Sequence, residues 1–136
     1  MLGWLAGCTL VAIGLISLQL AGVRAQDDAS KPEFYTTRVK PILETNCGEC
    51  HMNGNKKGAL VIDTQAGLKK GGRDGKVIDP GDPENSMFLK LIRHEGPEDD
   101  PMPMPPKKPK MSEADIAVIT AWIKAGAVMP PDPAAP

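Results

Sequence analysis

The pentapeptide Cys47-Gly48-Glu49-Cys50-His51 decides how this chain of 136 residues is organised. A C-x-x-C-H sequence is the attachment motif for a covalently bound c-type haem. Two thiols three positions apart lie on one helical turn, where each can add to a vinyl group of the porphyrin. The adjacent imidazole then faces the iron, while a backbone carbonyl or a carboxylate holds its other ring nitrogen. The motif therefore predicts one haem c per chain, attached through Cys47 and Cys50, with His51 as an iron ligand.

Two other kinds of site use a similar pair of cysteines. A structural zinc site needs four Cys or His ligands, usually in two separated pairs, and only His94 is left outside the motif. A redox dithiol of the thioredoxin type would begin a helix within a β-α-β pattern, but no strand pattern precedes Cys47. Each alternative needs something that the chain does not supply, so covalent haem is the favoured interpretation.

The first 25 residues have the pattern of a secretory signal. They contain no acidic residue and one base, Arg24, and the run from Leu2 to Val23 is almost wholly apolar. Small residues before Gln26 fit cleavage after Ala25, so we expect residues 1–25 to be a signal peptide and the protein to be periplasmic or otherwise extracytoplasmic. The segment lacks a basic start and is long enough to span a bilayer. An uncleaved membrane anchor is therefore the alternative.

The remainder of the chain is long enough for one small domain. It holds all 14 prolines and only four aromatic residues, so the polypeptide alone makes a thin core. A flat apolar macrocycle would supply much of the missing buried surface, and we expect a poorly folded apoprotein. A formal net charge of −1 gives no electrostatic support to nucleic-acid binding.

Apolar spacing predicts an all-α domain of helices joined by long loops. A first helix from Phe34, kinked or interrupted by Pro41, leads to the motif. Asp63 or Thr64 can cap a short helix that stops at Gly71-Gly72. We expect a flexible segment over residues 26–33, the domain over 34–128 and a disordered Pro-rich tail over 129–136.

Two later helices have recognisable starts. Asp82-Pro83-Glu84 is typical of a helix start and predicts an apolar face of Met87, Phe88, Leu91 and Ile92. Ser112 is the predicted cap of the last helix, whose apolar face comprises Ile116, Ile119, Trp122 and Ile123.

The second axial ligand is predicted to be a methionine, because a neutral thioether stabilises reduced iron and suits electron transfer. Met102 and Met104 both have flanking prolines, which stiffen the backbone that presents the side chain. The prolines do not discriminate between them. His94 is the third candidate and would give a lower potential. Met87 and Met111 fit apolar helix faces and are expected in the core.

These segments resemble the small c-type cytochrome domains of the planctomycete type, a branch of the class I cytochrome c fold. The resemblance covers residues 34–128. It rests on the pentapeptide and on the motifs Val39–Leu43, Gly58–Leu60, Asp63-Thr64, Pro80–Ser86, Met104–Lys107, Met111–Ile116 and Trp122–Ala127.

The resemblance implies a fold in which helices and long loops wrap around a covalent haem. In that family the methionine of the Met-Pro-Pro segment is the sixth ligand, which corresponds to Met104. The additional Met102-Pro103 departs from the family pattern. The resemblance also implies that the first helix packs on the last, with Tyr35 or Phe34 against Trp122.

The sequence therefore predicts an exported mono-haem cytochrome that carries one electron between redox proteins and is not an enzyme. The alternatives are a haem enzyme or gas sensor with an open sixth site, and a haem subunit of a larger membrane complex. We expect a monomer without a nucleic-acid partner. Contact with a membrane is expected only if the N-terminal segment is not cleaved.

Overall fold

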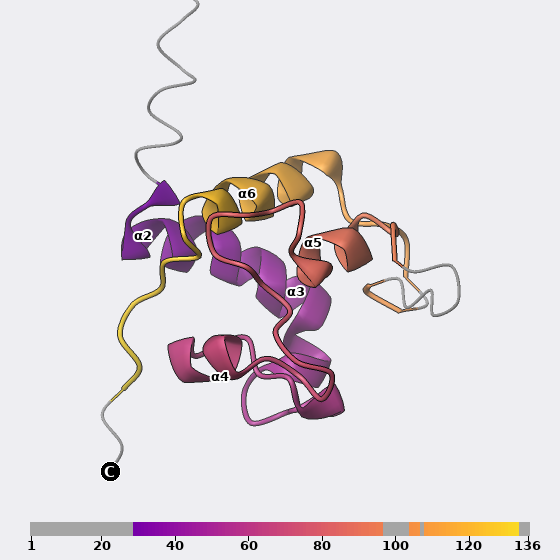
Figure 1. Ribbon diagram of the computed structural model, residues 1–136, viewed down its shortest axis with the longest axis horizontal. Helices are drawn as coiled ribbons and strands as arrows, with labels where there is room; N and C mark the ends of the chain where they lie inside the picture. The colour runs from indigo at the N-terminus through magenta and orange to yellow at the C-terminus, as the bar shows by residue number, and fades with distance from the viewer. Residues whose placement is uncertain (1–28, 97–103, 107, 134–136) are drawn as a thin grey trace, which may run out of the picture.

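The computed structural model describes residues 29–96, 104–106 and 108–133 (Figure 1). These residues form α2 (Pro32–Phe34), the π-helical turn η1 (Tyr35–Val39), α3 (Lys40–His51), the 3-10 turn η2 (Lys57–Ala59), α4 (Gln65–Lys70), α5 (Met87–Ile92) and α6 (Glu113–Lys124). Within these ranges there is no β-strand, as an all-α domain requires. None of the described helices is long and apolar enough to cross a membrane. The predicted signal segment lies outside the described residues.

The first helical stretch is continuous across Pro41, which lies in the first turn of α3. Immediately before it, η1 has the wider π spacing, and the amide of Lys40 donates to the carbonyl of Tyr35. Proline has no N–H to give to a preceding turn, and a π turn is a common way for a helix to absorb a local change of register. The expected kink is therefore replaced by a π turn that carries the chain on to the motif.

The short helix α4 begins and ends as its sequence predicts. The Thr64 hydroxyl accepts a hydrogen bond from the amide of Gly67 at 3.0 Å. At the other end, Gly71 has φ of 76°, and a Cβ atom there would collide with the backbone of Gly75. Only glycine allows this close turn, so the helix ends there.

The helix predicted from Asp82 starts later than expected. Asp82 instead caps a turn, since its carboxylate accepts hydrogen bonds from the amide and the side chain of Asn85 at 3.2 and 2.6 Å. These hydrogen bonds lower the pKa of Asp82. The helix α5 then begins at Met87, after the buried residue Ser86. Met87 is 37% exposed, so its predicted place in the core is wrong, whereas Met111 is buried at 6%.

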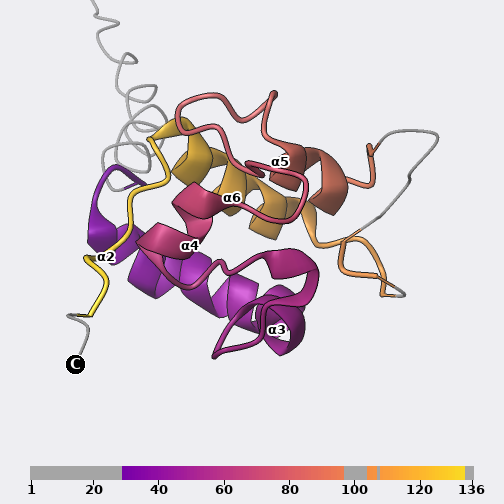
Figure 2. The same cartoon turned by 60° about the horizontal axis from the view of Figure 1, so that its bottom comes forward.

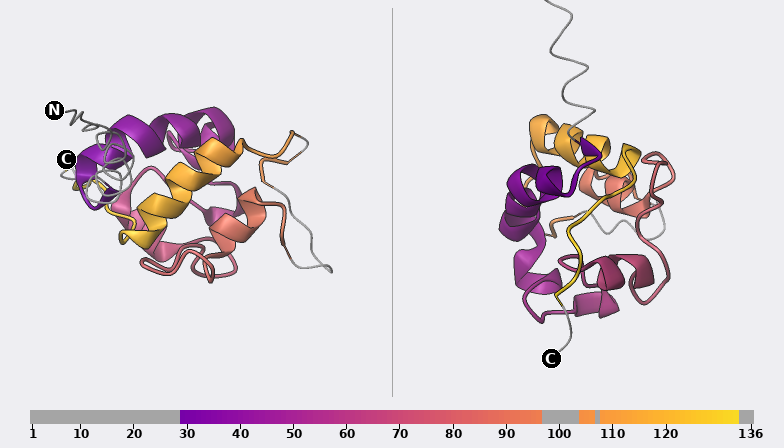
Figure 3. Two further views of the ribbon diagram at one scale, coloured as in Figure 1. Left: turned by 90° about the horizontal axis from the view of Figure 1, so that it is seen from above. Right: turned by 90° about the vertical axis from the view of Figure 1, so that its left-hand side faces the viewer.

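The last helix lies across the first, as the left view of Figure 3 shows. The Ser112 hydroxyl accepts from the amide of Asp115 at 3.1 Å and caps α6, as predicted. The four apolar side chains predicted for its inner face are all buried. The ring of Trp122 lies against that of Tyr35, with centroids 5.6 Å apart, which confirms the contact implied by the resemblance. The crossing of these two helices forms one end of the core.

Both ends of the described chain pack against the domain. Ala29 and Met129 are 1% and 5% exposed and belong to the core. After α6 the chain turns back past α4, as the right view of Figure 3 shows. There the Asp132 carboxylate accepts hydrogen bonds from the amides of Gln65 and Ala66 at 2.6 and 2.9 Å. Residues 129–133 therefore contact the rest of the domain, while the flexibility of residues 26–33 and the disorder of residues 129–136 stay predictions.

Candidate haem-binding site

The pentapeptide forms the last turn of α3, beside the loop that leads to α4 (Figure 2). Cys47 and Cys50 are both partly buried and neither is in a disulfide. Their spacing of three residues places both thiols on one side of the helix. The helix therefore presents two free thiols and the imidazole of His51 from a single turn.

His51 is held from two directions by the chain that follows it. Its Nδ1 atom lies 3.4 Å from the carbonyl oxygen of Leu60. Its own carbonyl accepts a hydrogen bond from the amide of Ile62 at 3.0 Å. Because a carbonyl oxygen can only accept, the first contact assigns the proton to Nδ1 and leaves Nε2 as the ligand atom. A backbone carbonyl at one ring nitrogen is the support expected for an iron-ligating histidine.

Burial dominates the environment of the Cys47 thiol. It raises the pKa of Cys47 to about 11, while the charge of Lys108 acts in the opposite direction and Cys50 adds a smaller increase. Cys47 packs at the edge of the hydrophobic core.

Met104 lies at the edge of the same core as Cys47. Its amide donates to the carbonyl of Leu91, just before the end of α5, at 3.1 Å, and the following Pro105 is buried. The backbone that carries this thioether is therefore attached to the fold on both sides of the side chain. Met102, the alternative ligand, lies outside the described residues.

The other rival ligand, His94, is exposed and has φ of 61° just after α5. Met52, which follows His51 in sequence, is 1% exposed and fills the core. No periodic signal in the sequence indicated the burial of Met52 or the position of the Leu60 carbonyl beside His51. Only the short apolar run that follows the Gly/Asn/Lys loop indicated that the chain returns there.

These residues fit a covalently bound haem. A c-type haem needs two unpaired thiols, an imidazole with one nitrogen already hydrogen-bonded, and an apolar setting. The last turn of α3 supplies the first two, and Cys47, Leu60 and Met104 all border the apolar core. The two thiols, the imidazole and the apolar surroundings thus meet the requirements of a c-type haem.

Residues 47–108 match the family model described as Planctomycete cytochrome C. The chain carries a planctomycete-type cytochrome c domain. This finding confirms the family that the motifs resemble, and the family implies haem c as the cofactor. No curated protein and no solved structure matches the chain. The matched segment of the cytochrome domain begins at Cys47 and includes Met104.

Proposed function

We propose that this cytochrome is an exported mono-haem protein that carries one electron between two redox proteins. The observation that supports the proposal most directly is the last turn of α3. It combines two free cysteines with a histidine whose Nδ1 is held by Leu60. The family match supports the same cofactor.

In this proposal each residue has a separate task. Cys47 and Cys50 form the thioether bonds, His51 ligates the iron through Nε2, and Met104 is the second axial ligand. The haem supplies an iron that gains and loses one electron. The hydrogen bond to Leu60 fixes the orientation of the imidazole, and the buried side chains next to Cys47 keep water away from the ring. With both axial positions filled, a substrate has no open iron site, which favours a carrier over an enzyme.

The proposal also includes the events that precede haem attachment. The two cysteines must be reduced, because a disulfide between them would compete with thioether formation. Export places the chain where this attachment takes place, after cleavage behind Ala25 or with residues 1–25 retained as an anchor. The mass of the purified protein distinguishes the two N-termini.

The decisive experiment is production of the full chain in a bacterial periplasm together with the host's haem-attachment machinery. We expect a coloured protein whose mass exceeds that of the polypeptide by one haem. The oxidised protein should be low-spin and show a weak sulfur-to-iron charge-transfer band near the red edge of the spectrum. A colourless product without the added mass would refute the proposal.

Separate variants identify the second ligand. Met104→Ala should lose the charge-transfer band, while Met102→Ala and His94→Ala should keep it. Loss of the band in the Met102 variant alone would transfer the assignment to that residue. A high-spin wild-type protein that binds carbon monoxide rapidly would instead favour the enzyme or sensor alternative.

A further inference from the structure

A cavity of about 470 Å³ lies between α4, the segment 76–80 and the start of the C-terminal segment. Its walls are largely apolar and include Leu68, Ile78 and Met129, all of which are buried. Two of its lining residues are cationic, Lys69 and Lys76. The cavity therefore has an apolar interior with positive charge along one part of its lining.

These two lysines have no anionic partner within the part of the chain that the structure describes. Its ion pairs join Lys40 to Glu44, Arg93 to Glu84 and Lys110 to Glu113. The nearby carboxylate of Asp132 is used by the amides at the start of α4. Lys69 and Lys76 are both exposed, so their ammonium groups are free to meet an anion at the cavity.

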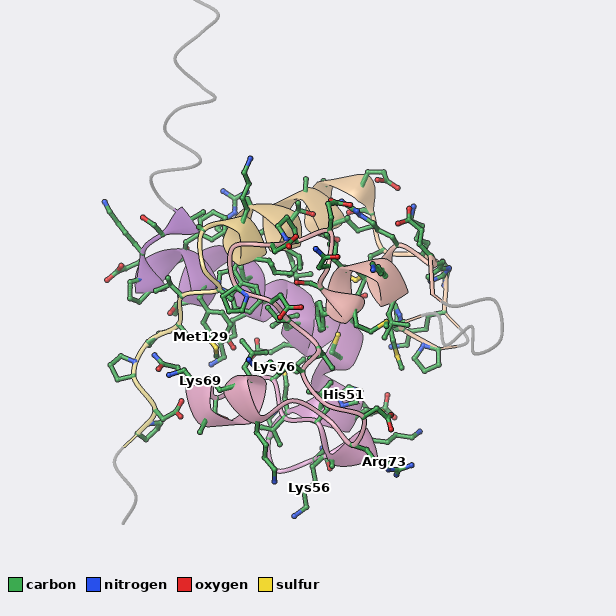
Figure 4. All side chains as sticks on the ribbon, viewed as in Figure 1. His51, Lys56, Lys69, Arg73, Lys76 and Met129 are labelled. Atoms are coloured by element: carbon green, nitrogen blue, oxygen red, sulfur yellow. The ribbon has the colours of Figure 1, made fainter. Side chains whose placement is uncertain are left out.

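The position of the lysines relative to His51 matters for a bound porphyrin. In Figure 4 Lys69, Lys76 and Met129 lie to one side of His51, toward the C-terminal segment. The labelled side chains of Arg73 and Lys56 lie elsewhere, beyond and below His51. Lys69 and Lys76 thus combine two features: they line the apolar cavity, and they are set apart from the turn that carries the thiols.

The separation of Lys69 and Lys76 from the thiol-bearing turn can be compared with the arrangement of substituents on haem. Its two vinyl groups lie on one edge of the ring and its two propionates on the opposite edge. A ring attached through Cys47 and Cys50 therefore directs its propionates away from the last turn of α3. Carboxylates at the edge of an apolar cavity need cationic or hydrogen-bonding partners, and ammonium groups provide charge-assisted hydrogen bonds.

We propose that Lys69 and Lys76 bind the two propionates of the haem at this cavity. The inference rests on the proposed function, because it requires the haem to be attached at Cys47 and Cys50. The lysines are positioning residues: they hold the carboxylate edge of the ring and place two positive charges near the iron. Positive charge near the iron disfavours the oxidised state, so the pair raises the midpoint potential.

The test compares two double variants of the haem-loaded full chain. Lys69→Gln with Lys76→Gln removes both proposed partners. Lys56→Gln with Lys70→Gln removes the same charge from exposed positions that do not line the cavity. We expect the first pair to lower the midpoint potential clearly more than the second. The difference should persist at high salt, because a close ion pair is screened less than exposed charges.

A second readout reports on the carboxylates themselves. The propionate bending band in the resonance Raman spectrum should shift in the Lys69/Lys76 variant and stay in place in the Lys56/Lys70 variant. Lys69→Arg with Lys76→Arg keeps both charges and should retain most of the wild-type potential. Because all four lysines are exposed, these substitutions leave the core unchanged.

Equal falls in potential for the two glutamine pairs would show only a general effect of surface charge and would refute the inference. An unchanged Raman band in haem-loaded Lys69/Lys76 variant protein would do the same. Absence of haem from the wild-type protein would instead refute the proposed function. Haem content, measured first by mass and absorption, separates these outcomes.

Discussion

The ring of Tyr35 packs against that of Trp122, with centroids 5.6 Å apart and planes inclined by 39°. Both side chains are almost completely buried, at 3% and 0% exposed. The indole Nε1 also donates to the carbonyl of Val128 at 2.8 Å. Trp122 thus joins the first helix, the last helix and the start of the C-terminal segment.

Replacement of Trp122 by Ala should lower the free energy of unfolding by about 3–5 kcal/mol, because a large buried ring leaves a cavity. Trp122→Phe keeps a ring against Tyr35 but loses the hydrogen bond to Val128, so a smaller loss of about 1–2 kcal/mol is expected. Urea unfolding followed by circular dichroism measures both. Met87→Ala, at an exposed position, is the control and should change stability by less than about 0.5 kcal/mol. Equal losses for Ala and Phe would contradict the ring contact.

Because the phenol of Tyr35 is buried, we expect the protein to lose folding stability at alkaline pH. Burial, with smaller contributions from the charges of Asp63 and Glu44, raises its pKa from 10.0 to about 12. The unfolded chain loses this proton near pH 10, while the folded protein keeps it. Stability conferred by the protonated phenol is therefore complete below pH 10 and falls as the pH rises towards 12.

Tyr35→Phe removes the titrating group and should flatten this fall. The contribution of one such group is at most about 1.4 kcal/mol per pH unit. Urea unfolding between pH 8 and 12 measures the free energy of unfolding of the wild-type protein and of the variant. Lysines titrate equally in both proteins, so their effect cancels when the two free energies are subtracted. The two curves should separate only above pH 10. Parallel curves over the whole range would show that the phenol ionises equally in both states.

We expect the C-terminal segment to stabilise the fold through the carboxylate of Asp132. It caps α4 through the amides of Gln65 and Ala66, and the side chain of Gln65 donates to the carbonyl of Met129 at 2.8 Å. Asp132→Ala should cost about 1 kcal/mol, or about 5 °C in Tm. Hydrogen exchange at the two amides should accelerate more than elsewhere. Asp74→Ala, an exposed loop substitution, is the control; equal effects of both would show that the cap contributes nothing.

Local signals allowed several elements to be predicted from the sequence. Thr64 and Ser112 cap helices within three residues of themselves, so their roles depend on nearby backbone only. The start of α5 was misplaced because Asp82 satisfies the same local preference in a turn held by Asn85. An Asx-type turn and a helix cap have nearly the same sequence pattern.

Features that depend on distant parts of the chain were missed. The C-terminal segment contacts α4 through Asp132 and Gln65, which are far apart in sequence. The support of His51 by Leu60 depends on how an intervening loop folds back. The pentapeptide was recognisable because its chemistry fixes both residue type and spacing. The cavity beside Lys69 and Lys76 has no such motif.

The contribution of the cofactor to folding can be tested by preventing its attachment. Cys47→Ser with Cys50→Ser removes both thioether bonds while leaving the apolar core residues in place. Each 100 Å² of ring surface buried on folding is worth about 2.5 kcal/mol, so the variant should unfold at a much lower urea concentration. Circular dichroism should show reduced helix content and a broader transition. Cys50→Ser alone, which retains one possible thioether, should be intermediate. A double variant that unfolds as cooperatively as the haem-loaded protein would show that the polypeptide core is sufficient by itself.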